Sequence, residues 1–131
     1  MIGLDALVTW HKGLALPIEF GWFVGPRARE FGQGDNVGLV TPTTSPGSDL
    51  EDIGDWFGFQ VRLTGREYQN AALYESAMTV DTALRYLGLP ATLWGTWIRA
   101  IIRAGGPPDV VQDDEHDRIS FVGNYLAHEL I

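Results

Sequence analysis

The spacing of the apolar residues changes in the middle of the chain, from every second residue to every third or fourth. The stretch WFGFQVRLTG, which begins at Trp56, alternates large apolar residues with polar or small ones, a period typical of a strand with one buried face. The alternating residues are Phe57, Phe59, Val61 and Leu63. In the next segment the residues at helical spacing are Leu73, Ala77, Val80, Leu84 and Leu87. This order of strand and helix favours an α+β fold.

Glycine and proline indicate where the predicted helices end. We expect the long helix to run from about Glu67 to Leu87, with Gly88 as a left-handed C-cap and Pro90 preventing continuation. A shorter amphipathic helix is expected near the start of the chain, with Gly13 near its end and Pro17 beyond it. Its apolar stripe consists of Leu4, Leu7, Val8 and Leu14.

Further strands are predicted by alternation and by turn residues between the segments. They span Ile18–Val24, Val37–Thr43, Trp94–Arg103 and Arg118–Leu130. Pro42 confines the second of these to a sheet edge or to its own end. We therefore expect one domain, residues 1–131, with a mostly antiparallel sheet, two helices packed on one face, and long exposed loops.

Charge and composition limit the classes of partner. The formal net charge of −8 opposes binding to a nucleic-acid backbone, because phosphate affinity depends on Lys and Arg. The absence of cysteine removes disulfides and thiolate chemistry. No apolar run is long enough to cross a bilayer, and the start lacks the pattern of a signal peptide, so we expect a protein that is made in a cytosol and does not bind membranes.

An acidic cluster, DDEHD, spans Asp113–Asp117 and is the one stretch that resembles a chemical site. Its spacing matches neither a calcium loop nor a zinc site, and five adjacent hydrophilic residues cannot easily keep one carboxylic acid neutral for catalysis. No phosphate loop, nucleophile motif or dinucleotide motif occurs elsewhere, so no catalytic, metal or cofactor-binding residue is assigned. We interpret the cluster as an exposed connection between two hairpin strands, with a small metal-binding or hydrolytic domain as the alternative. His11 is expected on the polar side of its helix, and His128 at the surface or the edge of the core.

Large side chains on the predicted strands point to association. Trp56, Trp94 and Trp97 stand at strand beginnings, where an aromatic ring is either a corner of the core or a contact anchor. The strand arginines either face solvent or pair with acids of a neighbouring subunit, because a guanidinium suits interface carboxylates. The candidate interface residues are Trp94, Trp97, Arg62, Arg99 and Arg103.

The C-terminal part of the chain resembles the tail terminator proteins, also labelled minor capsid proteins, of long-tailed bacteriophages, especially those of actinobacterial hosts. The matching pieces are the RxxGREYQ element from Arg62 to Gln69, the helix ending in LG, and the Gly105–Gly106 pair. A last motif, DDxxRxxFxxNY, departs from the pattern because His116 and Asp117 stand between Glu115 and the arginine. Its residues are Asp113, Asp114, Arg118, Phe121, Asn124 and Tyr125. The first fifty residues match poorly.

The resemblance implies a structural protein and no enzyme. In that family a hexameric ring caps the tail tube, stops its polymerisation and offers a surface to head-completion proteins. The implied partners are further copies of the chain, the tail tube protein and a head-completion protein, in a virion assembled in the host cytoplasm, with DNA passing through the lumen without specific binding. The acidic loop is the candidate lumen or tube contact, because acids repel phosphate. Its residues are Asp49, Glu51, Asp52 and Asp55.

Two alternatives to this role remain. A head-completion protein of the same neck, either a stopper or an adaptor, would bind the connector on the head side in place of the tube. An acidic inhibitor that imitates DNA would need a continuous acidic surface, whereas these acids are scattered along the chain.

Overall fold

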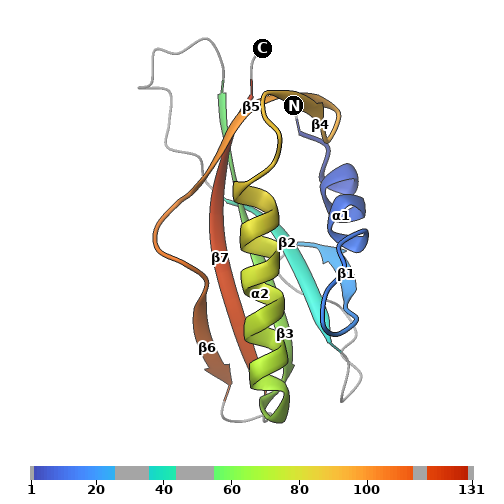
Figure 1. The fold of residues 1–131 in the computed structure, drawn as a ribbon, viewed down its shortest axis with the longest axis vertical. Coiled ribbons are helices and arrows are strands. Elements are labelled where there is room, and N and C mark those ends of the chain that lie inside the picture. The colour runs from blue at the N-terminus through green and yellow to red at the C-terminus, as the bar shows by residue number, and fades with distance from the viewer. Residues whose placement is uncertain (1, 26–35, 44–54, 114–117, 130–131) are drawn as a thin grey trace.

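The protein is a two-layer sandwich of one sheet and two helices in the computed structural model (Figure 1). The structure describes residues 2–25, 36–43, 55–113 and 118–129. In chain order the elements are α1 (Leu4–Lys12), β1 (Gly21–Val24), β2 (Val37–Thr43), β3 (Asp55–Arg66), the short 3-10 helix η1 (Glu67–Gln69), α2 (Asn70–Arg85), β4 (Ala91–Leu93), β5 (Thr96–Arg103), β6 (Asp109–Asp113) and β7 (Arg118–Glu129). The predicted α+β class is confirmed.

The sheet is built around two long central strands. Strands β3 and β7 pair antiparallel over twelve residues each, from Asp55 opposite Glu129 to Arg66 opposite Arg118. The sheet order is β1-β2-β3-β7-β5-β4, and β6 also pairs with β7. Because β5 and β6 pair with different ends of β7, they share its second edge. The strand pairs are antiparallel, with one exception: β1 pairs with β2 in parallel. The sequence did not predict this parallel pair.

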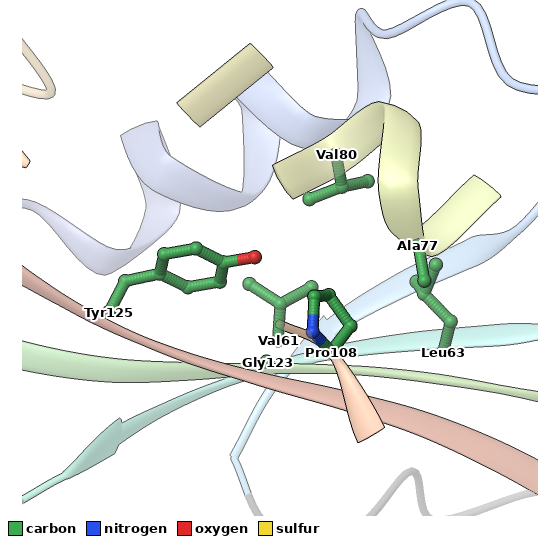
Figure 2. Close-up of a pocket in the computed structure, with 7 residues that line it drawn as sticks. All are labelled: Val61, Leu63, Ala77, Val80, Pro108, Gly123 and Tyr125. Carbon is green, nitrogen blue, oxygen red and sulfur yellow. The ribbon is translucent and has the colours of Figure 1, made fainter. Parts of the chain in front are cut away.

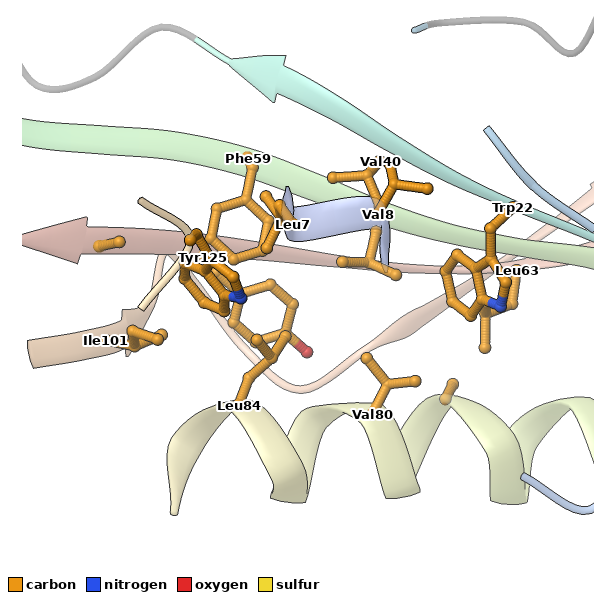
Figure 3. Close-up of a cluster of buried hydrophobic side chains, with 14 of the residues drawn as sticks. Leu7, Val8, Trp22, Val40, Phe59, Leu63, Val80, Leu84, Ile101 and Tyr125 are labelled. Carbon is orange, nitrogen blue, oxygen red and sulfur yellow. The ribbon is translucent and has the colours of Figure 1, made fainter. Parts of the chain in front are cut away.

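Both helices cover the same face of the sheet, as predicted (Figure 1). Side chains from α1 and α2 join those of β2, β3, β5 and β7 in one buried cluster (Figure 3). Leu7 and Leu84, from the two helices, are completely buried, as is Phe59 on β3. The Phe59 ring stacks on Tyr125 of β7 with ring centroids 5.6 Å apart. We call this side of the sheet the helix face and the opposite side the back face.

Close packing at the helix face depends on one glycine of β2. A Cβ atom at Gly38 would stand 2.4 Å from the ring of Trp22, the residue paired with it on β1. Two carbon atoms that are not bonded to each other cannot come this close. Only glycine at this position therefore lets the indole lie flat over β2. Trp22 is 7% exposed as a result and closes the end of the core beside α1.

Three predicted boundaries need correction. The strand predicted from Ile18 begins at Gly21, and the strand predicted from Trp94 begins at Thr96. The long helix ends at Arg85, and its cap is Tyr86, whose N–H donates to the Thr82 carbonyl at 3.0 Å. Gly88 is therefore not the C-cap, and its φ is not positive. Pro42 lies near the end of β2, past the residues that pair with β1, in agreement with the prediction that it marks an end.

Candidate functional site

The five predicted interface residues lie on different sides of the sheet. Trp94 is 4% exposed and belongs to the core of its own chain. Its ring makes edge contacts with Trp10, at 5.7 Å between centroids, and with Phe59, at 6.0 Å. Its carbonyl accepts a hydrogen bond from Gly3 N–H at 2.9 Å, which fastens the start of the chain to the hairpin. Of the two interpretations of this tryptophan, the structure supports the core corner and contradicts the contact anchor.

The backbone explains why Trp94 turns inward. Trp94 and Gly95 have φ angles of 55° and 83° and form the two-residue turn between β4 and β5. Two successive positive φ angles match the twist of a tight hairpin. A bulky residue seldom adopts this conformation, so burial of the indole has to offset the backbone cost.

Arg103 is held inside its own chain by Asp81 of α2. The Arg103 Nε donates to Asp81 Oδ1 at 2.9 Å, and its Nη2 pairs with Oδ2. The Tyr125 hydroxyl donates to Oδ1 at 2.9 Å, and Arg85 Nε lies 3.4 Å from Oδ2. Asp81 is completely buried. The predicted partner of Arg103, an acid of a neighbouring subunit, is therefore replaced by an acid of the same chain.

Electrostatics explains how Asp81 stays charged in the core. Burial alone would raise the pKa of its carboxyl group, but hydrogen bonds from Arg103 and Tyr125 and the charges of Arg103 and Arg85 outweigh that effect and lower it. Burial, together with the bond to Asp81, raises the pKa of the Tyr125 hydroxyl. The group thus joins α2, β5 and β7 through one ionised carboxylate, which is a structural role.

Arg62 lies on the back face within a row of polar contacts between β3 and β7. Its Nε donates to the Ser120 hydroxyl at 3.1 Å, and that hydroxyl lies 2.7 Å from Thr64 Oγ1. Gln60 Nε2 donates to Asn124 Oδ1 at 3.2 Å in the same row. Among the described residues Arg62 forms no ion pair. Its predicted pairing with a neighbouring subunit stays a prediction.

Trp97 and Ile102, both on β5, are the large apolar residues that this strand leaves in contact with solvent. Trp97 is 43% exposed and Ile102 is 45% exposed. Ile102 pairs with Leu126 on the back face. His128, opposite Ala100, contacts Trp56 with the two rings tilted and their centroids 4.8 Å apart. Trp56, Ile102 and Leu126 lie on the back face of neighbouring strands, and Trp97 lies five residues before Ile102 on β5, opposite Thr92 of β4. We call these four residues the back patch. Arg99 is exposed beside it, where a register shift interrupts the pairing of β5 with β7.

The predicted acidic positions fall largely outside the described residues. Asp49, Glu51 and Asp52 lie there, and Asp55 is the first residue of β3. Residues 114–117 lie there too, but the antiparallel pairing of β6 with β7 confirms that the acidic stretch connects a hairpin. Within the described part of the chain no three His, Asp or Glu residues are grouped so as to hold a metal ion.

His11 was predicted on the polar side of its helix, and this is wrong. The imidazole is completely buried against Trp10 and Trp22, with centroids 4.8 and 4.9 Å away. Its Nδ1 donates to the Leu7 carbonyl at 2.8 Å, so Nδ1 carries the proton. Burial lowers the pKa of His11 to about 4, against a weaker opposing effect of that hydrogen bond. His128 is likewise buried, at 2% exposed.

A small apolar gap lies between α2 and the sheet (Figure 2). Val80 and Ala77 of α2 close it on one side, and Val61, Pro108 and Tyr125 on the other. Its cavity volume is about 10 Å³, far below the roughly 300 Å³ at which small-molecule sites begin. The Tyr125 hydroxyl is already bound to Asp81, so the gap is a packing defect and offers no polar group to a ligand.

Comparisons with known proteins show the fold alone. A chain from the virion of a native gene transfer agent particle aligns over 96% of this chain and 86% of its own length, with a TM-score of 0.55 and 15% sequence identity. The two chains share a fold. A second solved structure covers 94% of this chain and 88% of its own, but its TM-score of 0.46 at 17% identity carries no argument. No protein-family model matches, and no curated protein matches significantly. None of the described helices is long and apolar enough to cross a membrane.

Proposed function

We propose that this protein is a structural component of a phage-like virion, and that within the virion it is the tail terminator. Copies of the chain form a ring, hexameric as in the family that the sequence resembles, which caps the completed tail tube and joins it to the head-completion proteins. The observation that carries the proposal is the likeness to a gene transfer agent virion chain over nearly the whole length of both chains. The resemblance of the C-terminal motifs, found independently in the sequence, supports the same role.

The motif residues support a structural use. Phe121 and Tyr125 face the core from β7, and Asn124 accepts the bond from Gln60 on the back face. Arg118 begins the same strand and is 9% exposed. These residues of the motif stabilise the central strand of the sheet, and none of them is assigned a chemical role. A structural role of this kind is consistent with a protein whose function is assembly.

The experiment that tests the role compares particles produced with and without this protein. A terminator stops tube growth, so its loss should yield tubes of uncontrolled length without heads, as measured by electron microscopy. A head-completion protein, the second candidate, would leave tubes of normal length that fail to join heads. Normal tubes with heads attached would contradict both roles.

The acidic loop belongs to the same proposal as a lumen or tube contact. Serine at Asp49, Glu51, Asp52 and Asp55 should leave ring formation intact and lower the yield of infectious or DNA-transferring particles, because the repulsion of DNA or the contact with the tube is lost. An unchanged yield would remove this role from the four acids and leave the ring proposal standing.

A further inference from the structure

The outer surface of α2 is poor in charge for a solvent-exposed helix. Its exposed side chains include Tyr74, Glu75 and Thr82, with Ala71 and Asn70 in the first turns. Tyr68, just before the helix, is 83% exposed, and Tyr74 is 48% exposed over the edge of Phe121. Interfaces are enriched in tyrosine and depleted of lysine and glutamate compared with free surface. We call these residues, Tyr68, Asn70, Ala71, Tyr74, Glu75 and Thr82, the helix patch.

The helix α2, which carries most of the helix patch, covers one face of the sheet (Figure 1). The back-patch residues of β3, β5 and β7 belong to the other face by their register. Glu75 and Thr82 lie on the side of α2 opposite its buried stripe, and Tyr74 lies on the flank of the helix over Phe121. The back patch lies on the face of the sheet that α1 and α2 leave uncovered. Surfaces on opposite sides of one subunit cannot meet each other within a two-fold dimer. They can meet only when one copy stacks on the next in a head-to-tail order, which is the interface type that builds a ring.

The charges of the two patches are complementary. The exposed cation at the back patch is Arg99, and the exposed charge on the outer surface of α2 itself is the carboxylate of Glu75. The other arginines near α2 are engaged within the chain, since Arg85 and Arg103 contact Asp81. Contact between the two patches thus brings Arg99 and Glu75, which carry opposite charges, together beside apolar and aromatic side chains.

We infer that a second copy of this chain is the partner of the back patch, and that it docks there through its helix patch. Tyr74 of one copy packs against apolar side chains of the back patch of the next, and Glu75 lies near Arg99. The inference rests on the proposed ring and identifies its two subunit surfaces. It retains Trp97 and Arg99 as interface residues and excludes Trp94 and Arg103, which are used inside the subunit.

Cysteine cross-linking tests the pairing directly, because the chain contains no cysteine. Thr82→Cys on the helix patch and Ile102→Cys on β5 are both at exposed positions, so neither substitution is expected to disturb the fold. With a short thiol-specific bismaleimide, the double variant at high concentration should give a ladder of bands beyond the dimer on a denaturing gel. A mixture of the two single variants should stop at the dimer. Lys12→Cys with Ile102→Cys is the matched control and should give no ladder, since Lys12 is exposed on α1 outside both patches.

Charge reversal supplies the second readout. Arg99→Glu should weaken self-association about tenfold or more, and Glu75→Arg in the same chain should restore it. A double-cysteine sample that stays monomeric, stops at the dimer, or assembles without a ladder overturns the pairing. If electron microscopy still shows rings at tube ends while the ladder is absent, the pairing fails and the proposed function stands. If a ladder forms but tubes without the protein keep their normal length and their heads, the pairing stands and the terminator role fails.

Discussion

The two faces of the central strands β3 and β7 are stabilised in different ways. On the helix face, apolar side chains such as Phe59 and Leu63 are buried under α1 and α2, and the ionised Asp81 is fully paired. On the back face, hydroxyl and amide groups form a row of hydrogen bonds, from Gln60–Asn124 to Thr64–Ser120.

The helix face is buried by residues of the same subunit, whereas part of the back face leaves large apolar side chains exposed and available to a partner. The helix face is closed by residues of the same subunit, including the aromatic group of Trp10, Trp22 and Trp94. The β5 side of the back face keeps Trp97 and Ile102 more than 40% exposed. Exposed apolar patches on an otherwise polar surface are typical of interaction sites. The stability of the subunit should therefore depend on the first face and its assembly on the second.

The largest expected effect comes from Phe59 on the helix face. Phe59→Ala should lower the free energy of unfolding by about 4 kcal/mol, because it leaves a cavity under both helices. Phe23→Ala, which removes the same ring from a side chain that is 45% exposed, should cost less than about 1 kcal/mol. Urea denaturation of the two variants checks this contrast, and equal losses would contradict the division between the faces.

Asp81→Asn should cost about 3 kcal/mol, because removing the charge leaves two arginines facing a neutral group in a buried site. Glu75→Gln, an exposed carboxylate on the same helix, is the matched control and should change the free energy of unfolding by less than about 0.5 kcal/mol. Thermal unfolding of both variants at neutral pH tests the prediction. A loss below about 1 kcal/mol for Asp81→Asn would mean that the paired carboxylate does not stabilise the packing of α2.

Acid should destabilise the helix face through His11. The pKa of His11 is about 4 in the folded protein and 6.5 in the unfolded chain, so the unfolded chain takes up the proton first as the pH falls. The neutral, buried His11 therefore makes its full contribution to the free energy of unfolding above pH 6.5. About 2–3 kcal/mol of that free energy is lost as the pH falls toward 4. His11→Phe keeps an aromatic ring between Trp10 and Trp22 but does not titrate. The difference in unfolding free energy between wild type and variant should therefore depend on pH in this window, and a constant difference would refute the mechanism.

The smallest effect on stability is expected at Ile102 on the back face of β5, and the adjacent Ile101, which lies on the helix face, is the matched comparison. Ile102→Thr should change the free energy of unfolding by less than about 0.5 kcal/mol and reduce self-association, because its side chain is 45% exposed. Ile101→Thr, at 8% exposed on the helix face, should cost about 2 kcal/mol. Denaturation and light scattering on both variants test the pair. The contrast fails if Ile102→Thr destabilises the subunit as much as Ile101→Thr does.

The sequence predicted the elements whose periodicity is strong and missed those that depend on spatial neighbours. Strand β3 and helix α2 were found because their apolar spacing is regular over many residues. The burial of His11 had a signal that was not used, since His11 follows Leu7 by four residues and therefore shares its face of α1.

The division of the predicted interface residues had no such signal. Whether Arg103 meets Asp81 depends on β5 pairing with β7 under α2, which spacing along the chain does not encode. The inward turn of Trp94 depends on the tight turn between β4 and β5, and the sequence pattern had merged that turn into one longer strand. Residue type identified the side chains worth examining, and the topology of the sheet determined which of them are exposed.

The central claim is that this subunit completes its own core and assembles with further copies on a tail tube. The most direct test is the mass of the purified protein, alone and mixed with tail-tube protein, by light scattering coupled to size exclusion, with electron microscopy of the tube ends. The account predicts an assembly of several copies that forms a ring at one end of the tube. A protein that remains monomeric and leaves the tube ends bare would contradict it.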